Sequence, residues 1–360
     1  MKVRKVRKYK VISIMSGTSL DGVDLAYCKF NLKKKIWDYS IEASQTFSYS
    51  PEWKNKLSSA HLLSGESLLE LHFRYGKFLG QLCNQFTKQK KIKKIDLIAS
   101  HGHTIFHQPK NKFTFQLGDG NSIHATTGLP VAFDFRSLDV ALGGEGAPLV
   151  PIGDKLLFSD FDLCLNFGGI ANLSMDLKGN RKAFDICFCN MALNYLSVKA
   201  GKDFDKNGKM ARQGSINQKL LISLEKIYHT NQKKNPSLGR EGFEKGAQHL
   251  LDNESIPLND RLRSACESIA NEIVLSIPTS KKEMKLLITG GGALNQFLIE
   301  LIKSKLSSDI EIIIPSKTII NFKEALVFAF LGVLRLRNEN NVLKSVTGAS
   351  HNSCSGVLIG

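Results

Sequence analysis

The feature that most constrains this chain is a strand–glycine turn–strand pattern that occurs twice. The two copies read VISIMSGTSLDGVDLAYC, beginning at Val11, and DLCLNFGGIANLSMDL, beginning at Asp162. They lie about 150 residues apart, which is the length of an ordinary domain. We therefore expect two related domains, at residues 1–150 and 151–360.

The remaining sequence alternates short apolar segments with amphipathic ones, a pattern typical of α/β proteins. Strands are expected at 11–15, 23–30, 95–100 and 130–135, more weakly at 37–49, and then at 162–167, 173–177, 183–186, 286–289 and 310–314. Helices are expected at 68–86, at 148–158, up to about Ala200, at 293–306 and at 324–337. Residues 338–360 are polar and are expected to form mostly loop.

Charge and cysteine content narrow the functional classes. The chain has 49 Lys and Arg against 33 Asp and Glu, a net charge of +16, with basic runs at 2–10 and 88–94. No nucleic-acid motif accompanies these runs, so we interpret them as solvated and expect an anionic small-molecule partner rather than nucleic acid. The seven cysteines lack C-x-x-C spacing, and the longest apolar stretch, Ala325 to Leu334, is too short to span a bilayer. We expect a reduced, cytoplasmic protein without a membrane segment.

Three glycine turns follow strands, at Gly17–Gly22, Gly168–Gly169 and Gly290–Gly292. Such turns bring backbone N–H groups close to phosphate oxygens. The first turn adds several hydroxyl groups, and Asp21 in it is suited to a hydrated Mg²⁺. The alternative is an ordinary hairpin with an Asp-Gly type I′ turn.

Two further positions follow predicted strands, where ligand contacts collect in α/β sheets. Asp185 precedes a predicted helix and is a candidate general base or a helix N-cap. His101 and His103 are candidates for a metal site, for contact with substrate or phosphate, or for a structural role.

Arg136 is suited to a substrate carboxylate, or alternatively to an ion pair with Asp134 or Asp139. The small residues at 143–148 are candidates for a hinge. Cys187 and Cys189 are interpreted as buried free thiols rather than as a redox or metal pair.

Taken together, these segments resemble the anhydro-N-acetylmuramic acid kinases, a family of the actin-like, hexokinase-like sugar kinases. The resemblance extends from Ile14 to about Thr347. It is carried by the motifs MSGTSLDGVD (15–24), SHG (100–102), DFR (134–136), GGEGAPLVP (143–151), NFGGIAN (166–172), GRE (239–241), GGGALN (290–295) and EA (324–325). It implies an α/β fold with two actin-like (ribonuclease H-like) domains around a nucleotide cleft.

The resemblance also implies a reaction. The family opens 1,6-anhydro-N-acetylmuramic acid with water and phosphorylates O6 from ATP with Mg²⁺, giving N-acetylmuramic acid 6-phosphate and ADP. Asp185 matches the catalytic base, and a homodimer is expected. Asp21 matches the family's metal position. The residues that match the family's nucleotide site are Gly17, Thr18, Ser19, Leu20, Asp21, Gly22, Val23, Asp24, Gly168, Gly169, Gly290, Gly291, Gly292 and Asn295. The residues that match its sugar site are His101, Arg136, Asn190 and Glu324.

One segment departs from the family pattern. After the catalytic aspartate the family has Thr-Gly-Pro-Gly-Asn, whereas this chain has Ile186-Cys187-Phe188-Cys189-Asn190. The change leaves two alternatives open: a kinase of another sugar, and a silent relative that binds sugar or nucleotide without catalysis.

Overall fold

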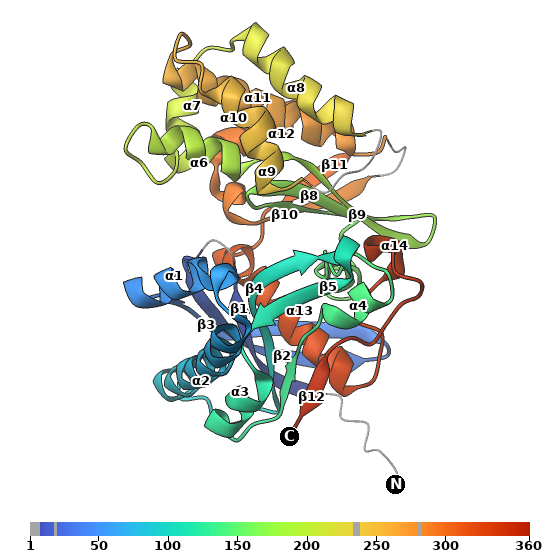
Figure 1. Cartoon of the computed structure of the whole chain (residues 1–360). Coiled ribbons are helices and arrows are strands. Elements are labelled where there is room, and N and C mark those ends of the chain that lie inside the picture. Colours follow the sequence, from blue (N-terminus) through green and yellow to red (C-terminus); the bar gives the residue numbers. More distant parts are fainter. Residues whose placement is uncertain (1–7, 18–19, 233–237, 280–282) are drawn as a thin grey trace. The chain divides into compact units, whose positions relative to one another are not determined.

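The computed structural model describes residues 8–17, 20–232, 238–279 and 283–360, coloured along the chain in Figure 1. Two of the expected phosphate-binding residues, Thr18 and Ser19, and the basic residues 2–7 lie outside the described residues. The chain divides into two compact units, the first formed by residues 1–158 and 322–360 and the second by 159–321. This division differs from the expected 1–150 and 151–360, because the last segment of the chain belongs to the first unit.

The first unit is built on a mixed sheet with the strand order β12-β6-β4-β1-β2-β3, and β5 pairs with β4 beside it. Its strands are β1 (Lys8–Ser16), β2 (Gly22–Lys33), β3 (Ile36–Ser48), β4 (Leu97–Gln108), β5 (Phe113–Leu117), β6 (Val131–Phe133) and β12 (Val357–Ile359). Its helical segments are α1 (Pro51–Ser58), η1 (Ala60–Leu62), α2 (Gly65–Gln89), η2 (Pro109–Asn111), α3 (Gly120–Thr127), α4 (Ser137–Ala141), α5 (Pro151–Leu156), α14 (Lys344–Thr347) and most of α13 (Lys317–Leu336).

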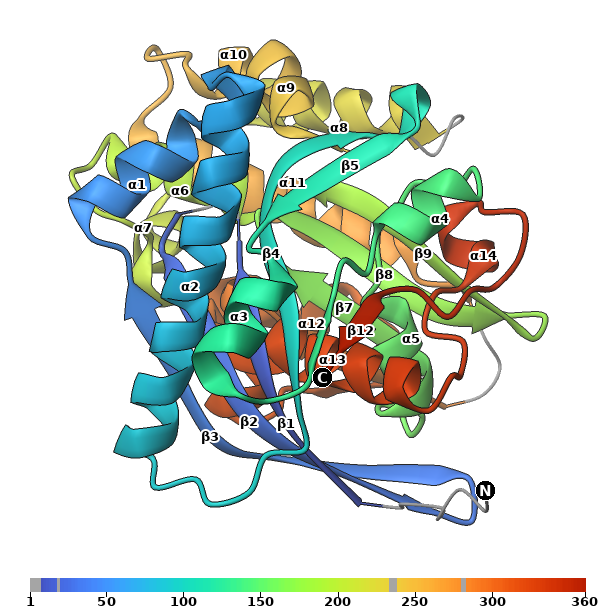
Figure 2. The same ribbon diagram turned by 60° about the horizontal axis from the view of Figure 1, so that its bottom comes forward.

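Helices α2 and α3 lie side by side on one face of this sheet, as Figure 2 shows. The α2 helix begins where the Ser64 hydroxyl accepts from the backbone N–H of Ser67 at 3.3 Å, an N-cap. Alternate residues of the strands, such as Ile14 and Leu25, point into the same core as the buried α2 side chains. On α2, Gly76 is required by the close approach of α3, because a Cβ there would lie 2.5 Å from the carbonyl oxygen of Asp119.

Helix α13 packs on this sheet through its apolar stretch. The Phe330 ring lies 5.4 Å from the ring of Phe30 in β2 and 5.0 Å from that of Trp37 in β3. A Cβ on Gly332 would lie 2.8 Å from the Cβ of Ala99 in β4. The longest apolar stretch of the chain is therefore a core helix. Among the described residues, no helix is long and apolar enough to cross a membrane.

The second unit contains a sheet with the order β11-β10-β7-β8-β9. Its strands are β7 (Leu163–Phe167), β8 (Ile170–Leu177), β9 (Asn180–Phe188), β10 (Met284–Thr289) and β11 (Ile310–Ile313). Its helical segments are α6 (Asn190–Val198), η3 (Lys206–Gly208), α7 (Lys209–Gln213), α8 (Gln218–Gln232), α9 (Arg240–Gly242), the π-helical η4 (Phe243–Ala247), α10 (Gln248–Leu251), α11 (Leu258–Ser276), η5 (Gly291–Leu294) and α12 (Gln296–Lys305). Leu165, Leu286 and Ile269 lie in one core formed by the sheet and these helices.

The two units repeat one topology. In the first, β1 is antiparallel to β2 and parallel to β4, and β4 is parallel to β6. In the second, β7 is antiparallel to β8 and parallel to β10, and β10 is parallel to β11. The expected pair of actin-like α/β units is confirmed, and the two hairpins recognised in the sequence occupy equivalent places in them.

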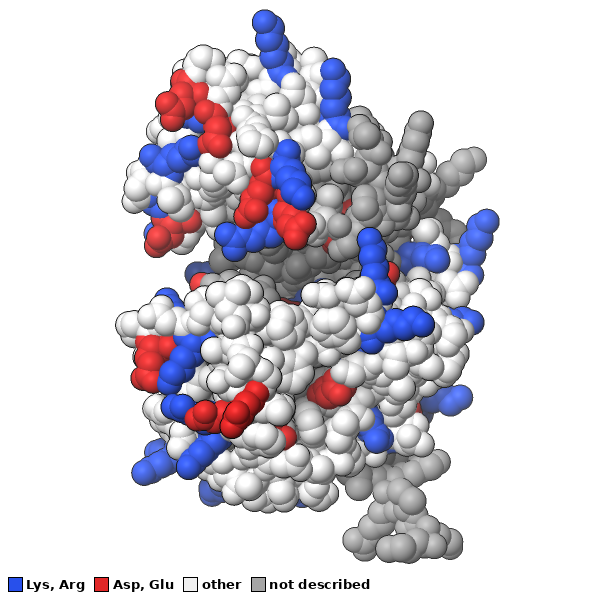
Figure 3. All heavy atoms as spheres, viewed as in Figure 1, with Lys and Arg blue, Asp and Glu red and all other residues white. Residues whose placement is uncertain are grey.

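The C-terminal segment holds more regular structure than expected. Residues 338–360 contain α14, and β12 pairs antiparallel with β6 at the edge of the first sheet, with Leu358 opposite Ala132. On the face shown in Figure 3, basic and acidic side chains are intermixed within each unit.

Candidate functional site

The two glycine turns of the second unit contact each other. Gly168 and Gly169 join β7 to β8, and Gly290 ends β10 with a φ of 81°, a left-handed conformation that favours glycine. A Cβ on Gly290 would lie 2.7 Å from the carbonyl oxygen of Phe167, and one on Gly292 would lie 2.7 Å from the Phe167 Cβ. Side chains at these positions would force the turns apart.

Asn190 links these turns at the start of α6. Its Nδ2 donates to the carbonyl oxygen of Phe167 at 2.9 Å, and its backbone N–H donates to that of Gly168 at 3.1 Å. Its Oδ1 lies 3.1 Å from where a Gly292 Cβ would be. The structure thus places this predicted sugar-binding residue beside the predicted nucleotide turns.

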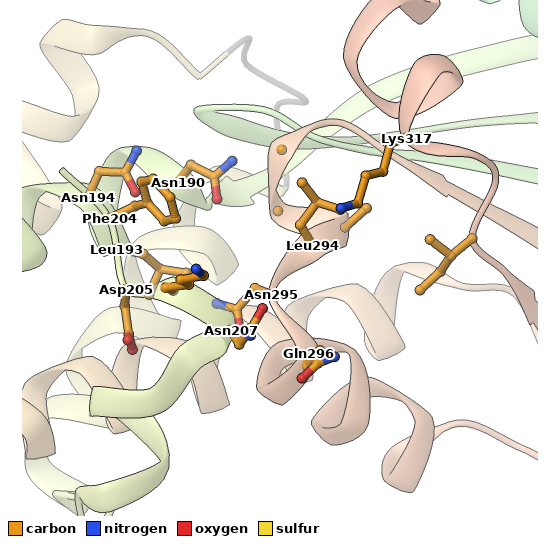
Figure 4. Close-up of a pocket in the computed structure, with 15 residues that line it drawn as sticks. Asn190, Leu193, Asn194, Phe204, Asp205, Asn207, Leu294, Asn295, Gln296 and Lys317 are labelled. Atoms are coloured by element: carbon orange, nitrogen blue, oxygen red, sulfur yellow. The ribbon is translucent and has the colours of Figure 1, made fainter.

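A cavity of about 800 Å³ opens beside the Gly290–Gly292 turn (Figure 4). Its volume is in the range of small-molecule and cofactor sites. The wall includes Asn190, Gly291, Gly292 and Asn295, so four residues predicted from the sequence meet here. The Asn295 side chain also caps α12, accepting from the Leu298 N–H at 3.1 Å.

The cavity wall also contains residues that the sequence analysis missed, among them Phe204, Asn207 and Lys317. They come from η3, from the residues that precede it and from the start of α13, segments that carry no recognised motif. For Phe204 and Asn207, the run Phe204-Asp205-Lys206-Asn207, with an aromatic residue beside charged and polar ones, is a signal that could have found them. Lys317 has no such signal around it.

Asp185 lies within β9, opposite Asn172 of β8, and is half-buried. Its Oδ2 accepts a hydrogen bond from the backbone N–H of Leu238 at 2.9 Å, which helps to orient the carboxyl group. The N-cap alternative is wrong, because α6 is preceded by Cys189, whose side chain makes no capping bond.

Ile186–Cys189, the segment that departs from the family pattern, is buried in the core of the second unit. Ile186, Cys187, Phe188 and Cys189 are each at most 5% exposed. The Phe188 ring lies 5.4 Å from that of Phe243. Burial raises the pKa of the Cys189 thiol to about 12 and also raises that of Cys187, so both stay protonated. The interpretation of these cysteines as buried thiols agrees with the structure, and their side chains fill the core.

In the first unit, His101 and Arg136 form one cluster. Nε and an Nη of Arg136 lie 3.1 and 2.8 Å from Nε2 of His101, and the other Nη donates to the Gly146 carbonyl oxygen at 2.7 Å. Since a guanidinium has only donors, Nε2 accepts and the proton of His101 lies on Nδ1, 2.9 Å from the Gly102 carbonyl oxygen. Burial and the Arg136 charge lower the pKa of His101 to about 3, which keeps it neutral.

The proposed ion pairs of Arg136 with neighbouring aspartates are not what the structure contains. Asp134 accepts from the Ser137 hydroxyl at 2.5 Å. Asp139 is fully buried and accepts from the Gly146 N–H and the Thr347 hydroxyl, each at 2.8 Å. Asp139 therefore ties the glycine-rich 143–146 segment to the C-terminal segment.

Glu324 lies on α13 in this same unit and is exposed to solvent. Desolvation by the surrounding protein raises the pKa of its carboxyl, Arg136 opposes the rise, and the Asp24 charge adds to it. Because water still reaches the side chain, solvent limits the size of this shift. Both charges that act on Glu324 belong to residues predicted as part of the site.

The first glycine segment lies in the turn between β1 and β2, and the structure describes its residues Gly17 and 20–22. Leu20 has a left-handed φ of 59°, and Asp21 is exposed. Gly22 lies against β3, where a Cβ would approach the Phe47 carbonyl oxygen to 2.5 Å. Asp24 accepts from the Thr46 hydroxyl at 2.5 Å, and burial raises the pKa of its carboxyl. Gly17 and Val23 flank this turn.

A buried hydroxyl network lies at the end of β1, next to the same turn. The Ser16 hydroxyl lies 2.7 Å from the Tyr49 hydroxyl and 2.9 Å from Nδ1 of His103, and Tyr75 donates to it at 3.0 Å. Burial lowers the pKa of His103 to about 4. His103 therefore has a structural role, and His101 points to Arg136. In the part of the chain that the structure describes, no group of three or more His, Cys, Asp or Glu residues is arranged to hold a metal ion.

The repeated topology and the paired glycine turns beside the cavity define an actin-like α/β protein. A family model described as anhydro-N-acetylmuramic acid kinase matches residues 9–359. The chain belongs to the anhydro-N-acetylmuramic acid kinase family.

Individual members of this family align with the chain over nearly its whole length. The anhydro-N-acetylmuramic acid kinase of Sulfurovum sp. (strain NBC37-1) is 34% identical over 371 residues, covering 98% of this chain and 99% of the relative. That of Vibrio parahaemolyticus is 33% identical over 364 residues, covering 96% and 97%. Among solved structures, the Acidaminococcus fermentans (R)-2-hydroxyglutaryl-CoA dehydratase component A aligns with a TM-score of 0.45 at 11% identity, over 90% of this chain and 97% of that one.

Proposed function

We propose that this chain is an ATP-dependent kinase that opens 1,6-anhydro-N-acetylmuramic acid with water and phosphorylates O6. The observation that carries the proposal is the near-full-length family match together with Asp185, whose carboxylate is oriented by the Leu238 N–H at 2.9 Å. A general base for water requires a carboxylate held in a defined orientation, and this hydrogen bond supplies one.

In the proposed reaction, Asp185 accepts a proton from water while the water oxygen bonds to C1 of the sugar. The C1–O6 bond breaks, and its electron pair goes to O6. That oxygen then attacks the γ-phosphorus of ATP, and the bond from the γ-phosphorus to the bridging oxygen breaks to release ADP. The products are N-acetylmuramic acid 6-phosphate and ADP.

We assign the nucleoside to the cavity beside Gly290–Gly292, which has a suitable volume of about 800 Å³. In the second unit the phosphates are assigned to the backbone N–H groups of the Gly168–Gly169 turn, and the family motif adds the 17–22 segment of the first unit as a further expected phosphate-binding segment. Mg²⁺ usually takes one or two protein carboxylates, with phosphates and water completing its shell. Asp21, which is exposed in its turn, fits that requirement, and the ion would neutralise phosphate charge.

The sugar is assigned to His101, Arg136 and Glu324, with Asn190 moved to the nucleotide side on the grounds of its contacts. Arg136 retains its charge beside a neutral His101, so its guanidinium remains available to attract the lactyl carboxylate. Ile186–Cys189 are buried in the core, so a kinase of another sugar and a silent relative remain the alternatives that the product analysis below must exclude.

The test is mass spectrometry of the product formed from anhydro-N-acetylmuramic acid, Mg²⁺-ATP and ¹⁸O-labelled water. We expect a phosphorylated sugar with the label at C1. An unlabelled product would exclude the coupled opening by water. No product, with ADP binding intact, would exclude this sugar and call for a panel of others. The homodimer that the resemblance implies and the cytoplasmic location expected from the cysteine content remain predictions, the first to be tested by light scattering of the full chain.

A further inference from the structure

Phe204 stands out in the second unit because its side chain is 58% exposed, although it is large and apolar. An exposed phenylalanine gains no stability from burial. This ring lines the cavity of about 800 Å³ beside the glycine turn. In Figure 4, Phe204 lies near Asn190 and Asn194, on the α6 side of the cavity.

The backbone that carries Phe204 is held in place by the next residue. Asp205 is 8% exposed, and its two carboxylate oxygens accept from the backbone N–H groups of Met210 and Ala211, each at 2.9 Å. These bonds hold the start of α7 and leave the carboxylate committed to a structural role. Asp205 therefore positions Phe204 and is not itself suited to contact a ligand.

The same turn is fitted closely against the glycine turn. Gly208 has a φ of 67°, and a Cβ there would lie 2.5 Å from Oδ1 of Asn295. Asn295 in turn caps α12 and follows the Gly291–Leu294 segment. The turn that follows Phe204 is thus packed closely against the residue that follows the glycine turn, while the ring itself stays exposed in the cavity.

We propose that Phe204 is the stacking platform for the base of the nucleotide. A flat apolar ring beside side-chain amides matches a purine, which offers an aromatic face and hydrogen-bonding edges. The Asn194, Asn207 and Gln296 carboxamides also line this cavity and supply both donors and acceptors. This inference rests on the proposed use of ATP and assigns to it a residue that no motif identified.

The experiment measures binding of ADP and of inorganic tripolyphosphate to the full chain by calorimetry. Loss of one base–aromatic stack corresponds to a loss of affinity between about fivefold and a hundredfold. We expect Phe204→Ala to weaken ADP binding within that range and Phe204→Tyr to retain it. Tripolyphosphate has no base, so its binding is expected to stay unchanged in Phe204→Ala.

A matched control is Phe113→Ala, which removes another exposed ring, 41% exposed, in β5 of the first unit. It is expected to leave ADP binding unchanged. Unchanged ADP affinity in Phe204→Ala, or an equal loss of ADP and tripolyphosphate binding, would overturn the proposal. Failure of the wild-type chain to bind ADP at all would instead contradict the proposed kinase, so the two failures are distinguishable.

Discussion

Arg136 and His101 form a pair in which a charged guanidinium donates to a neutral imidazole, with Nε of Arg136 3.1 Å from Nε2 of His101. The pair is possible because burial and the Arg136 charge lower the pKa of His101 to about 3. The arginine charge therefore has no anionic partner within this pair. Glu324 is the anionic group whose charge acts on Arg136, so in a site proposed to bind a sugar acid the substrate carboxylate would share this cation with Glu324.

The two buried histidines predict how stability depends on pH. The pKa of His101 is lowered to about 3 and that of His103 to about 4, from the ordinary 6.5. Below pH 6.5 the unfolded chain binds protons that the folded chain does not, so stability is complete above that pH and falls as the pH falls. The slope is up to about 1.4 kcal/mol per pH unit for each imidazole.

Urea denaturation at pH 7, 6 and 5 measures this slope. His101→Gln and His103→Gln are each expected to reduce it, because glutamine does not titrate. A slope that both substitutions leave unchanged would show that these histidines are not the groups responsible.

Asp185 is predicted to be essential for turnover but not for nucleotide binding. Asp185→Asn keeps the size of the side chain and removes its basicity, so kcat is expected to fall by about 10²- to 10⁴-fold. The affinity for ADP should remain within about twofold of wild type, since a base that acts on water contributes little to nucleotide binding. Asp160→Asn, an exposed site in the same unit, is the control. Retained activity in Asp185→Asn would remove this carboxylate from the mechanism.

Asp21 is predicted to act through Mg²⁺. Because it is exposed in its turn, Asp21→Asn should fold normally. We expect the Mg²⁺ concentration for half-maximal activity to rise several-fold, since one carboxylate ligand is lost. Measured Mg²⁺ titrations of kcat that coincide for variant and wild type would contradict this role.

Asp139 is predicted to stabilise the first unit by joining two distant segments. Asp139→Ala leaves the Gly146 N–H and the Thr347 hydroxyl without their acceptor in a buried place, which costs about 2–3 kcal/mol of unfolding free energy. Thr347→Val removes only one of these bonds but leaves a buried Asp139 oxygen without its donor, so it should cost about 1–2 kcal/mol, less than Asp139→Ala. Losses below about 0.5 kcal/mol in both variants, measured by urea denaturation, would show that Asp139 does not join the two segments.

Thiol reactivity tests the packing of Ile186–Cys189, the segment that departs from the family pattern. Six of the seven cysteines are buried, including Cys187 and Cys189, and Cys354 alone is half-exposed. Burial raises the pKa of these thiols, so the folded chain should react with an aromatic disulfide at about one thiol quickly and at the others only after denaturation. Cys354→Ser is expected to abolish the fast phase. A second fast thiol that disappears in Cys187→Ser or Cys189→Ser would place that cysteine near solvent and contradict the packing.

The apolar alternation and the glycine turns in the sequence determined the strands and the repeated hairpins. Val11–Met15 and Val23–Phe30 lie within β1 and β2, and the helix expected at 68–86 lies within α2. These features are local, because backbone conformation at a glycine and the period of burial depend on neighbouring residues. The family motifs also predicted the nucleotide-binding turns and the catalytic role of Asp185.

Tertiary structure alone decided how distant segments combine. The sequence did not show that residues 322–360 return to the first unit, because an apolar helix pattern predicts burial but not the sheet that buries it. Nor did it show that Arg136 pairs with a histidine 35 residues away rather than with nearby aspartates, or that Phe204 shares a cavity wall with Asn295. Such contacts depend on packing between segments far apart in the chain, and a local sequence pattern does not indicate which segments will pack together.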